Sequence, residues 1–466
     1  MRYVLPVLLL VGAVGAAFVA IDRVDVPPRQ FGPWVERRAE GHGILQRGGR
    51  EIAAVLLALD RGRAAFHAPL PVPAPAIGEP PAAKRRVIVA STQEARRAID
   101  DARPGDDITF VPGTYRFDGA YIDAHEAGAP GAPITVSADE QHGVVLEFDM
   151  IEGFLVRAPY WSFTNLTIRG VCRDHSNCEH AFHIVGAAGH FVARGNEIVD
   201  FNAHFKINGT GGAYPDWGVI EDNVIRNTAS RATANPVTPI DLVAASHWRI
   251  RGNRISDFVK LLGDHTSYGA FVKGGGSDNR LERNVVVCED RLRGLPGQRV
   301  GLSLGGGGSS RASCRDGRCI TEQDEGVIAS NLIASCSDDG IYLNRAATSA
   351  IRHNTLIDTA GITARFGESA AAVEGNLIDG PIRAVDGALL HPTDNRITAV
   401  AAFYLGLHPL RDLFMDAARL DLHWRQDPPR RERASSQPAD LCGTPRPAKP
   451  VYGAFEDIAR CAISRD

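Results

Sequence analysis

Lysine is rare in this chain, and its few copies are concentrated. Of the 51 lysine and arginine residues only five are lysines, and three of these five fall between residues 206 and 273. Lys206 (HFKING), Asp241 (PIDLV) and Lys273 (FVKGG) each lie in a short run of branched or aromatic residues, which is typical of strands. A lysine amine can remove a proton α to a carboxylate, and a second cation can stabilise the negative charge that develops. These residue types therefore suit base-catalysed chemistry on a uronic acid.

The elements that would position these residues repeat along the chain. An Asn followed by branched aliphatic residues returns every 22 to 47 residues, at Asn165, Asn196, Asn223, Asn253, Asn284, Asn331, Asn354 and Asn376. A base period near 22 residues with insertions predicts one solenoid coil per repeat, and an Asn at a fixed corner can bond to the coils on either side. The L-x-x-L-x-L pattern of leucine-rich repeats and the longer period of a propeller are absent. We therefore predict an all-β fold, a single-stranded right-handed parallel β-helix with an N-terminal cap helix.

Aligning the coils on these Asn residues predicts one outward-facing column of strand positions. It runs through His183, Lys206, Asp241, Lys273, Gly305, Asn344 and Arg365. Because coils stack about 4.8 Å apart, Lys206 and Lys273 would lie about 10 Å apart, a spacing that suits successive sugar units. We expect three catalytic residues in this column, Lys273, Lys206 and Arg365. We expect substrate to bind to His183, Asp241 and Asn344, and to His204 and Tyr268 on nearby turns.

The same column has a simpler interpretation, because outward residues of a β-helix are polar wherever water is present and a Lys-Asp-Lys stack is an ordinary surface ion pair. Glycine clusters at 209–212, 274–276 and 305–308 favour an open trough, although tight corners also need glycine. His204, His265 and Tyr268 are alternative bases.

Two other clusters could carry chemistry. The carboxylate pair Asp338 and Asp339 (CSDDGIYLN) is best interpreted as an Asx turn before a strand. His180 and His183, with His175 nearby, could bind zinc, but this spacing outside a helix is weak evidence, and we predict no metal site. The net charge of −4 argues against a nucleic-acid partner. Motifs of serine hydrolases, P-loop proteins and dinucleotide-binding proteins are absent.

The N-terminus and the cysteines indicate export. Residues 1–21 carry one Arg and then an unbroken apolar run from Val4 to Ile21, which predicts a signal peptide or an uncleaved N-terminal membrane anchor. Eight cysteines fit an oxidising, periplasmic or extracellular compartment. We expect four disulfides, Cys172–Cys178, Cys314–Cys319, Cys442–Cys461 and, across neighbouring coils, Cys288–Cys336.

The remaining segments flank the repeats. Residues 22–84 are an N-terminal segment, with a short helix expected near Glu51–Asp60 and a Pro/Ala-rich tether at 68–84. The β-helix is expected over 85–400, closed at its start by a capping-box helix at Ser91–Asp101. Residues 401–466 form a C-terminal cap and tail, with Gly453–Phe455 as the last strand or cap.

Several stretches resemble polysaccharide lyase family six, the chondroitinase-B-like and alginate-lyase group. They are the cap helix with ARPGDDITFVPGTY, then GAPGAPITVSA and YWSFTNLTIRG, and the resemblance spans about residues 86–400. In that family a Lys on a central strand is the base, an Arg follows one coil later, and an Asn and two acidic residues hold calcium. The resemblance implies that Lys273 takes the place of the base. Thr266 and Tyr268 stand where the family has its calcium acids, and Gly305 where it has its Arg. We therefore expect no cofactor, with calcium as the alternative that the resemblance leaves open.

Three functions follow as hypotheses. The first is a lyase that cleaves an acidic, uronic-acid-containing polysaccharide by β-elimination. The second is a uronan C5-epimerase, which begins with the same proton abstraction. The third is a non-catalytic carbohydrate-binding or envelope-structural solenoid. A hydrolase is disfavoured because the column carries no acid pair. We expect a monomer that contacts a membrane only through its N-terminal segment.

Overall fold

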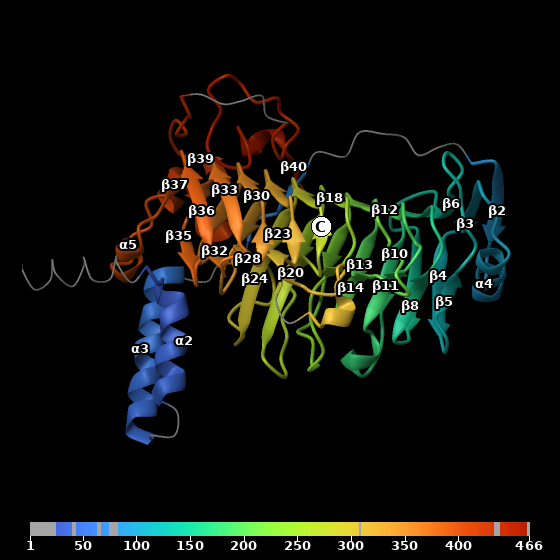
Figure 1. The fold of residues 1–466 in the computed structure, drawn as a ribbon, viewed down its shortest axis with the longest axis horizontal. Coiled ribbons are helices and arrows are strands. Elements are labelled where there is room, and N and C mark those ends of the chain that lie inside the picture. The colour runs from blue at the N-terminus through green and yellow to red at the C-terminus, as the bar shows by residue number, and fades with distance from the viewer. Residues whose placement is uncertain are drawn as a thin grey trace, which may run out of the picture.

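The computed structural model describes residues 25–39, 43–62, 67–73, 83–306, 309–432 and 439–463. Within these residues the chain forms an elongated solenoid of three long parallel sheets (Figure 1). The first sheet has 12 strands, from β2 (Arg85–Val89) to β36 (Leu389–Thr393), and the second has 11, from β4 (Gly113–Asp118) to β37 (Arg396–Ile397). The third has 10, from β5 (Ile122–Ala124) to β35 (Ile382–Val385). The predicted parallel β-helix is therefore confirmed.

Each coil contributes one short strand to each sheet. A central coil consists of β12 (Val192–Arg194), β13 (Glu197–Val199) and β14 (Ala203–Asn208). These strands pair in parallel with the next coil, which consists of β15 (Val219–Glu221), β16 (Val224–Arg226) and β17 (Ile240–Val243). The third sheet continues through β20 (Thr266–Lys273), β24 (Gln298–Gly305), β28 (Ile341–Asn344) and β32 (Ile362–Arg365).

The corner between the first and second sheets holds the predicted Asn ladder. In a typical coil Asn196 Nδ2 donates to the carbonyl of Phe163 (2.9 Å) and to Asn223 Oδ1 of the next coil (3.0 Å). The ladder continues, coil by coil, through Asn253, Asn284, Asn331, Asn354, Asn376 and Asn395. Since this corner is buried, the side chains satisfy backbone groups that water cannot reach.

The ladder differs from the prediction at its two ends. Asn165 does not belong to it, because Asn165 itself occupies the left-handed corner position (φ 60°) that precedes the ladder position in its coil. The ladder position there is Leu166, whose N–H donates to Asn196 Oδ1 (3.0 Å). Asn395 was not predicted, although it accepts from Asn376 at the far end.

The predicted cap helix closes the N-terminal end of the solenoid. Helix α4 spans Thr92–Asp100, and the side chain of its N-cap residue Ser91 accepts from the N–H of Glu94. Ala95 and Ile99 are buried and join the solenoid core. Behind them the core is lined by stacked rings, with Phe182 between Phe154 and Phe205 at centroid distances of 5.4 and 5.2 Å.

The N-terminal segment forms a helical hairpin rather than one short helix. Helices α2 (Pro28–Ala39) and α3 (Gly43–Arg61) project from the coils near the C-terminal end of the solenoid (Figure 1). The buried Arg29 bonds to Asp60 of α3 and to the carbonyl of Cys336 (2.8 Å). Arg61 bonds to Glu289 and Asp358 of the coils. The hairpin is thus held on the solenoid by ion pairs. Each buried charge has a partner of opposite sign, without which its burial would be destabilising.

The C-terminal segment covers the outer face of the second sheet. Its hairpin, β38 (Phe414–Asp416) and β39 (Asp421–Trp424), packs with Leu441 and Phe455 against outward apolar side chains of the coils. Gly453–Phe455 was expected as the last strand or a cap, and the strand alternative is wrong, because these residues lie in no strand and pack sideways on the sheet. The last strand, β40 (Ala462–Ile463), pairs with β1 (Pro71–Val72).

All eight cysteines form disulfides in the predicted pairs, Cys172–Cys178, Cys288–Cys336, Cys314–Cys319 and Cys442–Cys461. Four disulfides are typical of proteins of an oxidising compartment. Among the described residues, no helix has the length and apolar character needed to cross a bilayer. The predicted signal or anchor segment, residues 1–21, lies outside the described residues.

Candidate functional site

A groove of about 650 Å³ lies on the outer face of the third sheet, above β14, β17 and β20. Outward side chains of these strands form its floor, among them Lys206, Asp241, Phe271 and Lys273. The connecting segments form its walls, together with Thr266 at the start of β20. They contribute residues 236–238, Lys260, Asp264, Gly306, Ser309, Ser310 and Ser313. Three of the five lysines of the chain therefore line one hollow.

Strand pairing places the predicted site residues in two rows instead of one column. His183 pairs with Lys206, Lys206 with Asp241, and Asp241 with Phe271. Lys273 pairs with Val243 and so belongs to a second row, two residues further along each strand. The prediction of one column was wrong between Asp241 and Lys273. The reason is that the connection between the second and third sheets changes length from coil to coil. Counting from the ladder Asn therefore does not give the register.

A fixed ion pair lies on the floor of the groove. Lys206 Nζ is 2.7 Å from Asp241 Oδ2. Asp241 is only 5% exposed, and no described group bonds to its Oδ1 atom. Asp241 therefore holds the half-buried Lys206 ammonium in one place, where it presents a positive charge to the groove.

Lys273 is a different kind of lysine. Burial lowers its pKa, the charge of Asp241 opposes this, and the charge of Lys206 adds to it. Its Nζ lies 4.3 Å from the centroid of the Phe271 ring, and no described carboxylate forms an ion pair with it. A lysine whose pKa is lowered and which lacks a carboxylate partner is suited to accept a proton. A Cβ on Gly306 would lie 2.9 Å from Lys273 Cδ, so glycine leaves room for this side chain.

The walls of the groove add residues that sequence reasoning had not assigned. Lys260 Nζ bonds to Asp264 Oδ1 (2.7 Å), and both side chains line the groove. Tyr268, which was predicted, also lines it, and its ring meets Phe271 edge-on at 5.6 Å. Burial raises the pKa of Tyr268, so its hydroxyl keeps its proton at neutral pH. The sequence feature that could have indicated Lys260 is its spacing of four residues from Asp264, within the stretch that also holds Lys206 and Lys273.

Four predicted residues do not line the groove, and His183, described below, is one of them. Arg365 pairs with Asp386 at 2.7 Å and lies on β32, three coils beyond Lys273 of β20. Asn344 is buried and its Nδ2 donates to the Tyr342 hydroxyl (3.2 Å). The assignment of His204 to the substrate site is wrong, because it is fully buried, its Nε2 faces the Arg226 carbonyl (3.1 Å), and burial lowers its pKa to about 3.

The acid pair Asp338 and Asp339 lies outside the groove, beneath α2. Asp338 accepts from Gln30 of α2 and from Gln298 (3.0 Å), and Asp339 accepts from Thr363 (2.8 Å). Burial and the neighbouring Asp338 raise the pKa of Asp339 to about 7. The pair therefore bonds to side chains of other elements, which the interpretation as a simple Asx turn did not include.

The groove residues do not fit calcium, which the family-six resemblance raised. Calcium prefers six to eight oxygen ligands with several carboxylates. The two groove carboxylates, Asp241 and Asp264, are each paired with a lysine. Thr266 Oγ1 donates to the Asp264 carbonyl, and no group of three or more acidic or imidazole ligands converges in the described part of the groove.

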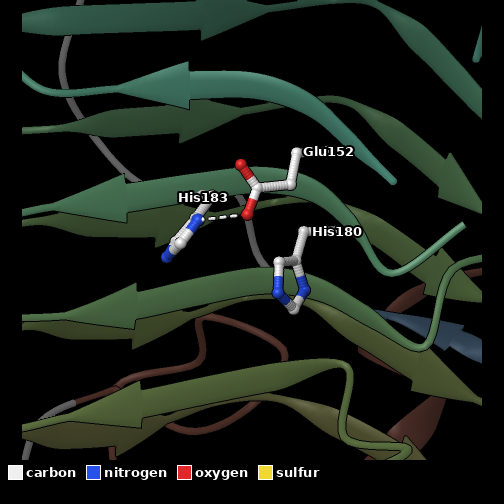
Figure 2. Close-up of side chains that lie close together, drawn as sticks. All are labelled: Glu152, His180 and His183. Carbon is white, nitrogen blue, oxygen red and sulfur yellow. Dashed lines mark hydrogen bonds and ion pairs between the residues drawn. The ribbon is translucent and has the colours of Figure 1, made fainter. Parts of the chain in front are cut away.

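One such group does exist next to the groove. Figure 2 shows Glu152 of β8 (Glu152–Val156) with its carboxylate toward His183, and His180 beside them, both histidines on β11 (His180–Val185). Glu152 Oε1 lies 2.7 Å from His183 Nδ1. His175 does not join them, because its Nδ1 accepts from the N–H of Ala232 elsewhere. Sequence reasoning missed Glu152, although it precedes His183 by 31 residues, which is one coil interval.

Comparisons with known proteins bear on the fold. A family model described as right handed beta helix region matches residues 218–397. No curated protein matches the chain. A pectate lyase, Pel9A, of known structure is similar at a TM-score of 0.52 and 14% identity, over 81% of this chain and 97% of that one. An alginate lyase from Paenibacillus sp. str. FPU-7 is similar at a TM-score of 0.32 and 15% identity, over 68% and 96%. The family model and the likeness to the pectate lyase agree with the sheets in assigning a right-handed parallel β-helix.

Proposed function

We propose that this protein is a lyase that cleaves an acidic, uronic-acid-containing polysaccharide by β-elimination in the groove. The observation that carries the proposal is the gathering of Lys206, Lys260 and Lys273 in one hollow of about 650 Å³. Lys206 and Lys260 are each paired with a carboxylate, and their ammonium groups can still donate hydrogen bonds to an anionic chain. The likeness to a pectate lyase extends to the fold, so the assignment of a reaction depends on these side chains.

Each step of the reaction has a candidate residue. Lys206, held by Asp241, binds the uronate carboxylate and stabilises the charge that develops on it. Lys273 removes the proton from the carbon α to that carboxylate. The electron pair of this C–H bond forms the C4–C5 double bond, and the bond from C4 to the glycosidic oxygen breaks. Tyr268, which is protonated, donates a proton to the leaving oxygen.

The compartment forms part of the proposal. Four disulfides and the apolar residues 4–21 support export to the periplasm or the cell exterior, with the N-terminal segment either removed or kept as a membrane anchor. An exported chain would meet polysaccharides of the envelope or the surroundings, and we propose that it acts as a monomer.

The test uses the whole protein with alginate, chondroitin and pectate. β-Elimination gives an unsaturated uronate whose ultraviolet absorbance can be followed directly. We expect K273A to lower kcat about 100-fold or more, because general-base catalysis contributes on the order of 10² to 10⁴. The matched control is K449A, since Lys449 is exposed and pairs with Glu432 far from the groove.

Two results would replace the proposal. If no unsaturated product forms but NMR shows inverted uronate stereochemistry at C5, the protein is an epimerase. If neither change occurs and K273A binds the polysaccharide as well as the wild type, the solenoid is a non-catalytic binding protein.

A further inference from the structure

The cluster of Glu152, His180 and His183 has the geometry of a metal site. One ligand atom from each residue lies within 4.8 Å of the other two. The three side chains come from two adjacent strands of the third sheet, β8 and β11, in which His180 pairs with Glu152 itself. Figure 2 shows the Glu152 carboxylate directed to the His183 ring, with the His180 ring beside this pair. The rigid sheet therefore holds all three groups close together.

The hydrogen bonds of His183 leave one of its nitrogens facing the carboxylate. Asn208 Nδ2 donates to the carbonyl of Gly209 (3.1 Å), so Asn208 Oδ1 faces His183 Nε2 at 2.9 Å and accepts its hydrogen. In a neutral imidazole His183 Nδ1 is then a lone pair, and it lies 2.7 Å from Glu152 Oε1. Two acceptors at this distance need a positive charge: a proton fits between them directly, and a zinc ion would move the two atoms to about 3 Å apart.

His180 carries a ring nitrogen that has no hydrogen-bond partner among the described residues. Its Nδ1 atom is buried, and no described group forms a hydrogen bond with it. Buried polar atoms normally have a partner, so each exception calls for a physical explanation.

We propose that Glu152, His180 and His183 bind a divalent transition-metal ion of the zinc class. Two imidazoles and one carboxylate are a ligand set that zinc accepts at catalytic sites. The contact from His183 to Asn208 is the outer hydrogen bond that metal-bound histidines usually make. Calcium is disfavoured because it takes oxygen ligands.

The site would lie at one end of the groove. His183 pairs with Lys206 in the next coil, and Asp241 holds the Lys206 ammonium in place. Three protein ligands leave at least one coordination position open. If the proposed function is correct, an anionic oxygen of the polysaccharide would take this position; the metal site itself does not depend on that function.

The test is metal binding by the whole, tag-free protein. After treatment with EDTA and dialysis, Zn²⁺ is titrated by calorimetry, and Co²⁺ is followed by its visible absorption. We expect one ion per chain. E152Q and H180A should weaken binding at least 10-fold, and N208A by about 10- to 100-fold, as outer-shell substitutions do.

The matched control is H247A. His247 also pairs with a carboxylate, Asp278, at 3.2 Å, but belongs to no cluster of three ligands among the described residues. We expect its affinity for Zn²⁺ to equal that of the wild type, with unchanged circular dichroism in all variants. Absence of binding, or equal binding by wild type, E152Q and H180A, would overturn the metal site. Because no substrate is present, this result is independent of any failure to find lyase activity.

Discussion

The Asn ladder predicts a stability difference between two substitutions that each remove four hydrogen bonds. Asn284 is fully buried. Its Nδ2 donates to the carbonyl of Ile250 (2.9 Å) and to Asn331 Oδ1 (3.0 Å), and its Oδ1 accepts from the backbone N–H and Nδ2 of Asn253 (3.0 Å each). N284A removes all four bonds. At about 1 kcal/mol each, with the Asn253 N–H left buried and unpaired, we expect a loss of about 4 kcal/mol.

The comparison is N395A at the end of the ladder. Asn395 also makes four hydrogen bonds, to the carbonyls of Val373 and Thr393 and from the N–H and Nδ2 of Asn376. Asn395 is only partly buried, so water can replace the lost partners, and we expect a cost of about 1 kcal/mol.

Urea unfolding followed by tryptophan fluorescence measures the difference. Trp161 and Trp248 are fully buried in the coils and report on the loss of the solenoid. Wild type, N284A and N395A should give similar m-values, so that the midpoints can be compared. Equal losses for the two variants would refute the reasoning, because burial would then not decide what a ladder Asn contributes.

Three further predictions concern stability. R29A should lower the free energy of unfolding by about 3–5 kcal/mol, since it leaves Asp60 buried without the Arg29 guanidinium. The control R47A, on the exposed part of α3, should lower it by less than about 0.5 kcal/mol, and thermal unfolding measures both. The pKa of Asp339 is raised to about 7, so the folded state binds the proton more tightly than the unfolded state. The free energy of unfolding of wild type should therefore exceed that of D339N near pH 4, and this excess should be lost as the pH rises through 7. A constant difference in unfolding free energy from pH 5 to 8 would contradict this. Replacing both cysteines of Cys288–Cys336, 48 residues apart, should cost about 4 kcal/mol, against about 2 kcal/mol for Cys172–Cys178, six residues apart, and equal urea midpoints would contradict the chain-entropy account.

The repeat pattern predicted the fold because the corner chemistry is local. A buried Asn after a left-handed residue recurs in each coil, and equivalent cysteines in two coils, Cys288 and Cys336, could be paired by counting repeats. The same counting failed for Lys273, because loops of variable length separate the corner from the third sheet. His204, which was expected on a nearby turn, lies instead on β14 with its Nε2 toward the Arg226 carbonyl.

Contacts between distant segments could not be predicted from the sequence. Nothing near Arg29 indicates that its side chain reaches the Cys336 carbonyl, more than 300 residues away. The metal-ligand candidates lie one coil apart, and only strand pairing shows that Glu152 and His180 face each other. Both the docking of the helical hairpin and the three-ligand cluster thus depend on which segments meet in the folded chain, and the spacing of residues in the sequence does not show this.

The covering of the second sheet by the C-terminal segment has a consequence for how the chain folds. A solenoid can add coil to coil as it grows, so most of its structure needs only neighbouring residues. Val285, Leu332 and Ile357 also face outward from the second sheet, and they are covered only when Phe414, Leu441 and Phe455 arrive. Until the last residues emerge, a nearly finished protein therefore exposes an apolar strip along its side, which makes aggregation the main risk of late assembly and of any truncation near residue 400.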